Sequence, residues 1–233
     1  MDFTPQDRLF VLTGAGISAE SGLATFRGSG GLWNGHRVED VATPEAWESN
    51  PALVWRFYSQ RRTDALAAQP NAAHRALTEI EQRLGAANGS FFLCTQNVDD
   101  LHERAGSRRI HHMHGSLFQS RCIRCNRPFP DQFLYETALP ICQTCSAPVR
   151  PHIVWFGEIP LDMDTIYIEL DRATTLLVVG TSGAVYPAAG FVHIARSHNI
   201  RTIYIGPEEP QNAEAFNEIL LGTATQVLPS LLA

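Results

Sequence analysis

The sequence predicts an α/β protein with a doubly wound, largely parallel, Rossmann-like sheet and a smaller lobe, made of a helical insertion and a four-cysteine zinc module. Short apolar runs alternate with amphipathic stretches, which is typical of a parallel sheet covered on both faces. A glycine turn follows the first apolar run, and four of the five cysteines form two C-x-x-C pairs. These three observations carry the fold prediction.

The first expected strand is the apolar run Leu9–Leu12, which leads into a Gly-Ala-Gly turn at 14–16. Strand, glycine turn and helix start match the dinucleotide fingerprint, whose glycines let backbone N–H groups approach a pyrophosphate. The acidic residue expected about twenty positions later has no convincing counterpart, because Glu39 and Asp40 follow a glycine-rich loop and not a second strand. A nucleotide must therefore be held differently than in a dehydrogenase.

The remaining elements continue the alternation. Asn50 and Pro51 form a helix start, with an N-cap followed by proline, and this helix should stop before Pro70. The further expected elements are a helix over 71–84 stopped by Gly85, a strand over 91–94, a short helix over 99–105 closed by Gly106, a strand over 153–156, a helical stretch from 161, a strand over 176–179, a helix over 187–197 and a strand over 202–205. We predict a discontinuous Rossmann-like domain of residues 1–34, 83–117 and 152–233, with a helical module (35–82) and a zinc-binding module (118–151) forming the small domain.

Composition restricts the class of protein. A formal net charge of −6 over 233 residues argues against nucleic acid as a specific partner, because phosphate binding needs clustered cations. All 18 basic residues are arginine, from coding bias or because an enzyme acting on lysine avoids modifying itself, and Schiff-base catalysis by lysine is excluded. No apolar run is long enough to cross a bilayer and no secretory signal is visible, so we expect no membrane partner and a cytoplasmic protein.

The cysteine pairs Cys122-x-x-Cys125 and Cys142-x-x-Cys145 have the spacing of a tetrahedral four-thiolate zinc site. The alternative is a set of unrelated core thiols. A catalytic zinc keeps an open position for water, whereas four thiolates leave none. The pattern therefore predicts one structural zinc ion.

Several peptides carry a family resemblance: GAGISAESG, TFRG, TQNVD, HMHGS, the two C-x-x-C turns, VWFGE and GTSGAVYPAAGF. Together they resemble the sirtuins, the NAD-dependent protein-lysine deacylases, and are most similar to bacterial class III members of the CobB type. The resemblance implies removal of acetyl groups, and also succinyl or malonyl groups, from protein lysines. The products would be nicotinamide, O-acyl-ADP-ribose and free lysine.

The resemblance also implies the roles of individual residues. His114 would be the general base, for which its near-neutral pKa is suited, and Asn97 would hold the ribose as the second catalytic residue. A metal-binding role for His111, His112 and His114 is the alternative, although close histidines rarely all converge. The implied contacts to NAD are Gly14, Ala15, Gly16, Glu20, Ser21, Phe26, Arg27, Trp33, Gln96, Asn97, Asp99, Gly180, Thr181, Ser182, Gly206, Glu208 and Ala224.

An acyl-lysine protein is expected to bind as an extended strand between residues 154–158 and 183–186. Tyr58 and Arg61 lie three apart on a predicted helix and share a face; the resemblance places them in the acyl tunnel, where guanidinium would bind a terminal carboxylate. The alternative is a surface arginine beside a half-buried tyrosine. The implied substrate contacts are Tyr58, Arg61, Val154, Trp155, Phe156, Gly157 and Val185.

Two positions depart from the family pattern, since Ala24 replaces a frequent proline and Gly206 replaces a usual asparagine. Other functions remain open at this stage. The same peptides would serve an NAD-dependent protein ADP-ribosyltransferase, and the cysteines alone would fit a non-catalytic zinc-ribbon or NAD-sensing binding module. We expect a monomer or weak oligomer.

Overall fold

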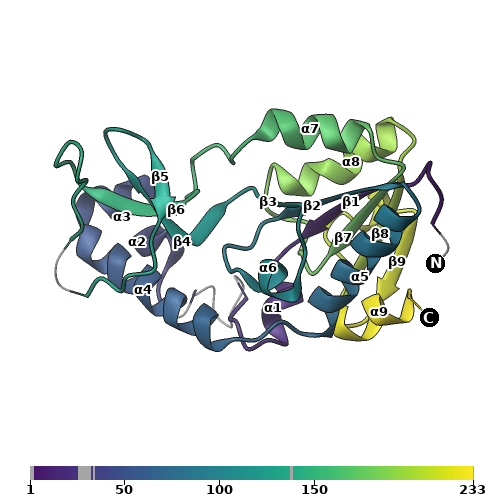
Figure 1. Cartoon of the computed structure of the whole chain (residues 1–233), viewed down its shortest axis with the longest axis horizontal. Coiled ribbons are helices and arrows are strands. Elements are labelled where there is room, and N and C mark those ends of the chain that lie inside the picture. Colours follow the sequence, from purple (N-terminus) through teal and green to yellow (C-terminus); the bar gives the residue numbers. More distant parts are fainter. Residues whose placement is uncertain (1–2, 26–32, 34, 137–138, 233) are drawn as a thin grey trace.

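The computed structural model describes residues 3–25, 33, 35–136 and 139–232. Two sheets lie towards opposite ends of an elongated molecule (Figure 1), one with six parallel strands and one with three antiparallel strands. The parallel sheet with helices on both faces confirms the predicted fold class. The boundaries of the two predicted domains stay a prediction.

The strand order of the large sheet reverses between β1 (Arg8–Thr13) and β7 (Thr175–Val179). Its strands are, from edge to edge, β3 (Ile110–His112), β2 (Ser90–Thr95), β1, β7, β8 (Arg201–Gly206) and β9 (Glu218–Leu221). The chain builds outward from β1 in one direction and from β7 in the other. Open α/β sheets bind ligands at the carboxyl ends of strands where the order reverses, so the site is expected beyond β1 and β7.

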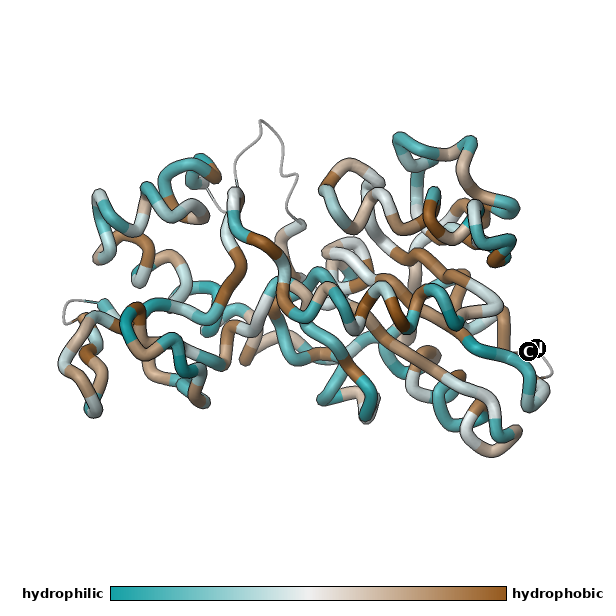
Figure 2. The backbone as a smooth tube through the Cα atoms, turned by 90° about the horizontal axis from the view of Figure 1, so that it is seen from above, coloured by the Kyte–Doolittle hydropathy of each residue, from teal (hydrophilic) through white to brown (hydrophobic). Residues whose placement is uncertain are grey.

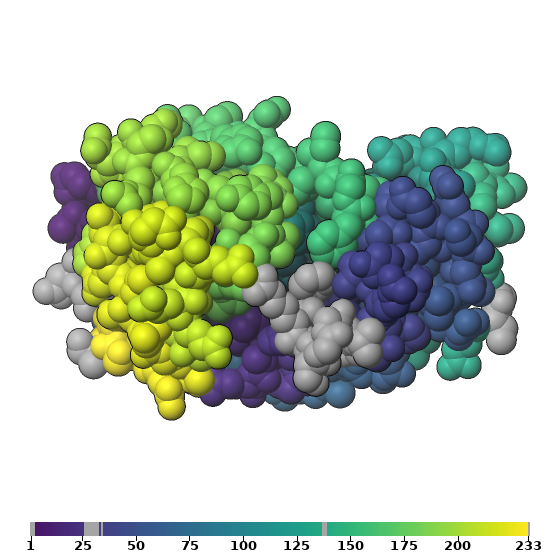
Figure 3. Space-filling model, turned by 180° about the vertical axis from the view of Figure 1, so that it is seen from behind, coloured from purple at the N-terminus to yellow at the C-terminus, as the bar shows by residue number. Residues whose placement is uncertain are grey.

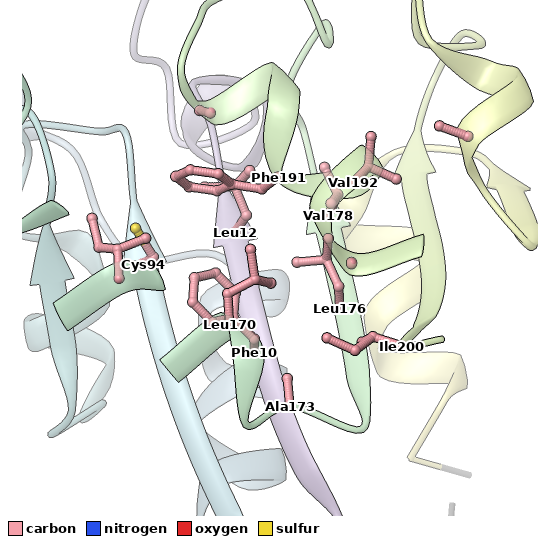
Figure 4. Packing of buried hydrophobic residues seen from close by; sticks show 14 of the residues in the cluster. Phe10, Leu12, Cys94, Leu170, Ala173, Leu176, Val178, Phe191, Val192 and Ile200 are labelled. Carbon is pink, nitrogen blue, oxygen red and sulfur yellow. The ribbon is translucent and has the colours of Figure 1, made fainter. Parts of the chain in front are cut away.

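Alternation along the strands separates two hydrophobic cores. Phe10, Leu12 and Val178 face α7 (Met163–Asp171) and α8 (Phe191–Ser197), and Figure 4 shows these side chains beside Phe191 and Leu170. The side chains at the alternate positions of the same strands point to the other face of the sheet, where they pack against α5 (Ala72–Ala86) and α9 (Ala224–Ser230). The tube in Figure 2 is brown along the inner strands and teal on many outer turns, as burial of both faces requires.

The small sheet packs against a group of helices. Its strands are β5 (Pro128–Pro130), β4 (Gly115–Cys122) and β6 (Val149–Ile153), and the helices are α2 (Val38–Val41), α3 (Pro44–Ser49) and α4 (Pro51–Ala67). Leu117 and Ile153 from the sheet join Val54 and Phe57 from α4 in one core. Figure 3 shows from behind that this end of the molecule (dark blue) lies opposite the end formed by the C-terminal segment (yellow).

Several local predictions are confirmed. Asn50 caps α4 by accepting a hydrogen bond from the backbone N–H of Leu53 at 3.0 Å, and Pro51 is the first helical residue. The short helix before Gly106 is α6 (Leu101–Ala105), and Gly106 has a φ of +105°. Across the described residues, no helix is both long and apolar enough to span a membrane.

Three predictions are wrong in detail. The strand expected over 153–156 is not part of the large sheet, because β6 ends at Ile153 and pairs with β4. Gly85 does not stop α5, which continues to Ala86. The helix expected from 187 starts as a 3₁₀ turn over Ala188–Gly190, after which α8 begins.

Candidate functional site

Two glycine turns interlock at the carboxyl ends of β1 and β7. The backbone N–H of Gly16 donates to the carbonyl of Gly180 at 2.8 Å. A Cβ at Gly16 would lie 2.7 Å from Gly180 Cα, and one at Gly14 would lie 2.8 Å from Thr181 Cβ. Gly180 also has a φ of +64°, which favours glycine. Glycine is therefore required here so that the turns after β1 and β7 can touch. These two strands lie at the reversal point, where the strand order of the sheet reverses. The same glycines would also allow a ligand to approach the backbone.

The helix that follows the first turn is short. The helix α1 covers only Gly16–Ala19, and Ala15 precedes it as the N-cap. Glu20 lies just beyond it and accepts a 2.6 Å hydrogen bond from the hydroxyl of Thr225 at the start of α9. Ser21 accepts one from Nδ2 of Asn71 at 3.0 Å. The bond to Thr225 brings the first turn next to α9, whose first residue is the buried Ala224, and the bond to Asn71 ties it to the start of α5.

Asn97 and Asp99 follow β2 and form a buried polar cluster with Ser18. Nδ2 of Asn97 donates to the carbonyl of Gly14 and to Oγ of Ser18, both at 3.2 Å. The hydroxyl of Ser18 donates to Oδ2 of Asp99 at 3.2 Å. Burial raises the pKa of the Asp99 carboxyl and outweighs the lowering effect of hydrogen bonds from the Leu101 N–H and from Ser18. The cluster joins the turns that follow β1 and β2.

Sequence reasoning missed two members of this cluster, Ser18 and His74. Nε2 of His74 lies 3.5 Å from Oγ of Ser18, and burial, with a smaller contribution from the charge of Arg75, lowers the pKa of His74 to about 4. A serine among the otherwise small residues after the glycine turn is a local signal that could have been used. His74 lies on α5, far along the chain, and no local pattern connects it to Ser18.

His114 is held in one tautomer. Its Nδ1 lies 3.1 Å from the carbonyl of Gln96, and because a carbonyl can only accept, Nδ1 carries the proton and Nε2 carries the lone pair. Burial lowers the pKa of His114, and the Gln96 hydrogen bond offsets this only in part. The side chain of Gln96 donates to Oγ1 of Thr181 at 3.2 Å. A neutral imidazole near the reversal point can accept a proton.

The other two histidines of the segment point to different partners. Nδ1 of His112 lies 3.0 Å from the Asn97 carbonyl, and Nε2 lies 2.7 Å from a carboxylate oxygen of Glu103. Burial lowers the pKa of His112, but the hydrogen bond and charge of Glu103 outweigh it, so the pKa is raised. His111 stacks on Phe92 with ring centroids 5.9 Å apart. No metal site forms from these histidines within the part of the chain that the structure describes.

Tyr58 and Arg61 both lie buried on α4 in different surroundings. The hydroxyl oxygen of Tyr58 accepts a 3.0 Å hydrogen bond from Nε1 of Trp155, and burial raises the tyrosine pKa. The Arg61 guanidinium carbon lies 4.3 Å above the ring of Trp33, which also packs edge-on against Phe57. Trp33, expected at NAD, thus lies against the predicted acyl pocket.

Arg61 is a buried guanidinium without a polar partner among the described residues. Its exposed fraction is 9%, and Nε is fully enclosed without a hydrogen-bond acceptor. Burial lowers the pKa of the guanidinium. A buried charge is normally paired, so the position is suited to an anionic group that binds from outside.

Residues 154–158, expected beside the substrate peptide, form a turn and not a strand. The N–H of Val154 donates to the His114 carbonyl at 2.9 Å, and the N–H of Glu158 donates to the Trp155 carbonyl at 3.0 Å. Gly157 has a φ of +89° at this turn. The half-buried Val185 lies in the opposite segment, which is also outside any strand.

Glu158 anchors the turn over residues 154–158. The carboxylate of Glu158 accepts from Arg150 at 2.7 and 2.9 Å, from Arg121 at 3.0 Å and from the Trp155 N–H at 2.8 Å. The charges of both arginines and these hydrogen bonds lower the pKa of Glu158 against the raising effect of burial. The turn is therefore anchored to the small sheet beside His114.

The remaining predicted contacts lie at the carboxyl ends of β7 and β8. Gly180, Thr181 and Ser182 follow β7, and the Ser182 carbonyl accepts from the backbone N–H of Gln211 at 3.2 Å. Gly206 ends β8, while Glu208 is exposed on the turn beyond it. Phe26 and Arg27 lie outside the described residues.

The four zinc-module cysteines converge. The sulfurs of Cys122, Cys125, Cys142 and Cys145 all lie within 4.8 Å of one another, with 3.5 Å between those of Cys122 and Cys145. A tetrahedral zinc with Zn–S bonds of about 2.3 Å holds sulfurs roughly 3.8 Å apart. Backbone N–H groups of Cys125 and Arg124 point at the Cys122 sulfur, at 3.3 and 3.4 Å. The thiol set fits one structural zinc ion and leaves no ligand position for water.

Comparison with known proteins defines the class. The profile described as the Sir2 family matches residues 14–187. The chain belongs to the Sir2 family.

Individual relatives add detail. A curated "NAD-dependent protein deacylase" of Caulobacter vibrioides is 50% identical over 225 residues, covering 96% of this chain and 94% of that protein. A solved Sir2 homologue bound to NAD superposes with a TM-score of 0.88 at 43% identity, covering 96% of this chain and 87% of its own. A Sir2 complex with a p53 peptide and NAD gives a TM-score of 0.82 at 28% identity, covering 96% and 91%.

Proposed function

We propose that this protein is an NAD-dependent protein-lysine deacylase. Acyl-lysine, NAD and water would give lysine, nicotinamide and O-acyl-ADP-ribose. When bound, NAD supplies the electrophilic ribose carbon and the sugar that carries the acyl group away. The observation that carries the proposal is that His114 is held in one tautomer, close to the buried cluster of Asn97 and Ser18, where the strand order reverses. The chain that forms this site belongs to the Sir2 family.

His114 is the general base in this proposal. The Gln96 carbonyl holds Nδ1–H, so Nε2 is the atom that takes a proton from a ribose hydroxyl. The lowered pKa keeps the imidazole neutral around pH 7. The hydrogen bond to the Gln96 carbonyl favours the tautomer with the proton on Nδ1, which is the one that leaves Nε2 free to accept a proton.

Asn97 and Asp99 orient the nicotinamide end of NAD. Ser18 links the two side chains, and Asn97 is further held by the Gly14 carbonyl. Asp99 would accept from the carboxamide, and Asn97 would contact the ribose. The phosphates and adenosine of NAD would bind at the two glycine turns, 14–16 and 180–182. Further contacts would come from Glu20, Ser21, Gly206, Glu208 and Ala224.

Arg61 and Tyr58 make acyl groups with a terminal carboxylate substrates as well. The guanidinium is buried and has no polar partner among the described residues, so a succinyl or malonyl carboxylate would supply one. The Tyr58 hydroxyl still has its proton to donate, because the Trp155 contact uses only its oxygen. Acetyl-lysine lacks the carboxylate and would leave Arg61 stacked on Trp33.

The acyl-lysine protein would lie extended between residues 154–158 and 183–186, neither of which is paired in a strand. Val154, Trp155, Phe156, Gly157 and Val185 would contact its backbone and lysine stem. We propose that the reaction takes place in the cytoplasm, since cysteines arranged for a metal fit a reducing compartment. The net charge of −6 favours no nucleic-acid partner, and we propose a monomer or weak oligomer.

A panel of acetyl-, malonyl-, succinyl- and unmodified lysine peptides with NAD tests the reaction. Nicotinamide release should depend on the acyl peptide, and mass spectrometry should find one O-acyl-ADP-ribose for each lysine freed. Release that is independent of the acyl group, with ADP-ribose attached to protein, would identify an ADP-ribosyltransferase. The absence of both products would leave a binding module.

A further inference from the structure

The last polar side chain along β8 is Tyr204. Its ring is 3% exposed and belongs to the core on the α7 and α8 face, where it packs against Phe216 with centroids 5.4 Å apart. Only its hydroxyl is polar, and this donates to the backbone carbonyl of Thr181 at 3.2 Å. The tyrosine thus connects the end of β8 to the turn that follows β7.

Gly206 leaves the room that this hydroxyl occupies. Residues 204 and 206 lie on the same face of β8, because side chains alternate along a strand. A Cβ at Gly206 would lie 2.2 Å from Oη of Tyr204 and 2.6 Å from its Cζ. Gly206 is not among the residues with positive φ. The backbone conformation therefore does not require glycine here, whereas the tyrosine does.

Thr181 connects Tyr204 to the residues at the carboxyl ends of β1 and β2. Its Oγ1 accepts from Nε2 of Gln96 at 3.2 Å, and its Cβ lies where a side chain at Gly14 would be. The carbonyl of Gln96 is the group that orients His114. Hydrogen bonds therefore run from β8 through the turn after β7 to the end of β2 and the proposed base.

We propose that Tyr204 is a positioning residue for the NAD site, which acts by holding the Gly180–Ser182 turn through the Thr181 carbonyl. The inference rests on the proposed function in taking NAD as the ligand of this turn. Removing the hydroxyl would let the turn move away from the Gly14–Gly16 turn and from Gln96. Apolar packing against Phe216 needs only the ring, so a phenylalanine would serve the core equally well.

Tyr204→Phe separates positioning from packing. Loss of one neutral hydrogen bond of about 1 kcal/mol should weaken binding of NAD and of ADP-ribose by about fivefold, measured by calorimetry without any acyl peptide. In turnover, KM for NAD should rise while KM for the acyl peptide and kcat stay near wild type. Tyr167→Phe is the matched control, because Tyr167 packs on Phe191 at the same face and is 41% exposed.

The two proposals fail in different ways. If Tyr204→Phe binds ADP-ribose as tightly as the wild type does, the positioning role is wrong and the deacylase proposal stands. If the wild-type protein binds neither NAD nor ADP-ribose, the proposed function itself is wrong, and the positioning role falls with it.

Gly206→Ala tests the steric step. Its Cβ should push the Tyr204 hydroxyl off Thr181, lowering the melting temperature and weakening ADP-ribose binding at least as much as Tyr204→Phe does. Tyr204→Val removes the ring that a Cβ at residue 206 would meet, so the loss of stability in the double variant should be smaller than the sum of the losses in the two single variants. Wild-type melting and binding in Gly206→Ala, or strictly additive effects in the double variant, would contradict the pairing.

Discussion

Buried ionisable side chains near the small sheet and at the carboxyl edge of the large sheet differ in whether the chain supplies their polar partners. Beside the small sheet, the buried Arg62 of α4 donates to the carbonyls of Leu117 and Phe133 and to Ser120, and pairs with Asp131 at 3.4 Å. At the carboxyl edge of the large sheet and the adjoining part of α4, by contrast, burial shifts pKa values towards the neutral form or leaves a charge without a polar partner among the described residues. His114 has a lowered pKa, Asp99 a raised one, and Arg61 lacks a polar partner among the described residues.

Buried polar groups with and without internal partners have different roles. A buried charge that has all its partners inside the chain fixes one arrangement of that chain. One that lacks a partner is costly to stability and is explained if a ligand completes it. Arg61 and Arg62 are neighbours on α4 and differ in whether the chain supplies a polar partner, so matched substitutions at these two positions test the explanation.

Removal of zinc should have the largest effect. Zinc bound to Cys122, Cys125, Cys142 and Cys145 would join the two C-x-x-C turns, and the free energy of metal binding contributes to folding in such modules. A strong chelator should release one zinc per chain, lower the melting temperature and abolish turnover. Readdition of zinc should restore both. If zinc leaves while stability and rate stay unchanged, the structural role is wrong.

Arg62→Met should come next, through stability. The substitution leaves Asp131 buried without its cation and frees two carbonyls, which should cost about 3–5 kcal/mol in the free energy of unfolding. Urea unfolding measures the change. Arg56→Met, at an exposed position of the same helix, is the control and should change it by less than about 0.5 kcal/mol. A similar small change in Arg62→Met would show that the charge network does not support the fold.

His114→Ala should lower kcat by about 10²–10⁴-fold, as expected for loss of a general base, without changing the melting temperature or the zinc content. The pH profile gives a second measurement. The pKa of His114 is lowered below 6.5, so kcat/KM of the wild type should be flat at pH 7 and decline only as pH falls below that value. An acid limb with a midpoint above 6.5, or an active alanine variant, would remove His114 from the role of base.

The sequence predicted features that depend on neighbouring residues. The Asn50 cap, the Gly106 stop and the C-x-x-C spacing are local, and each is present in the structure. The strand expected over 153–156 failed because an apolar run does not reveal which strand it pairs with. The paired segment, β6, contains Arg150, Pro151 and His152, and it is a strand because β4 lies beside it.

The same limit applies to the site. Gln96, Asn97 and His114 stand in recognisable peptides at strand ends, whereas the contact of Ser18 with His74 and that of Tyr204 with Thr181 join residues distant in sequence. The partners of Arg62 are 55 to 71 residues away. The spacing within α4 places Arg61 on the face of Tyr58, but it does not reveal that Arg62 has partners inside the chain and that Arg61 has none among the described residues.

Arg61→Met is the smallest effect and the sharpest test. Loss of a charge-assisted hydrogen bond of about 1.5–3 kcal/mol should lower kcat/KM for succinyl-lysine by roughly 10–100-fold, with little change for acetyl-lysine. Stability should not fall, because the substitution removes a buried guanidinium that has no acceptor among the described residues. Arg61→Lys keeps the charge without the planar fork and should recover only part of the succinyl activity.

The Arg61→Met and Arg62→Met variants together test whether an internal partner separates structural from ligand-binding arginines. Opposite results, with Arg62→Met losing stability and Arg61→Met losing one class of substrate, would show that the presence of an internal partner separates structural from ligand-binding charge on this helix. Equal loss of acetyl and succinyl activity in Arg61→Met would show that Arg61 does not recognise a carboxylate. A marked fall in its stability would mean that stacking on Trp33 at 4.3 Å already satisfies the guanidinium without a ligand.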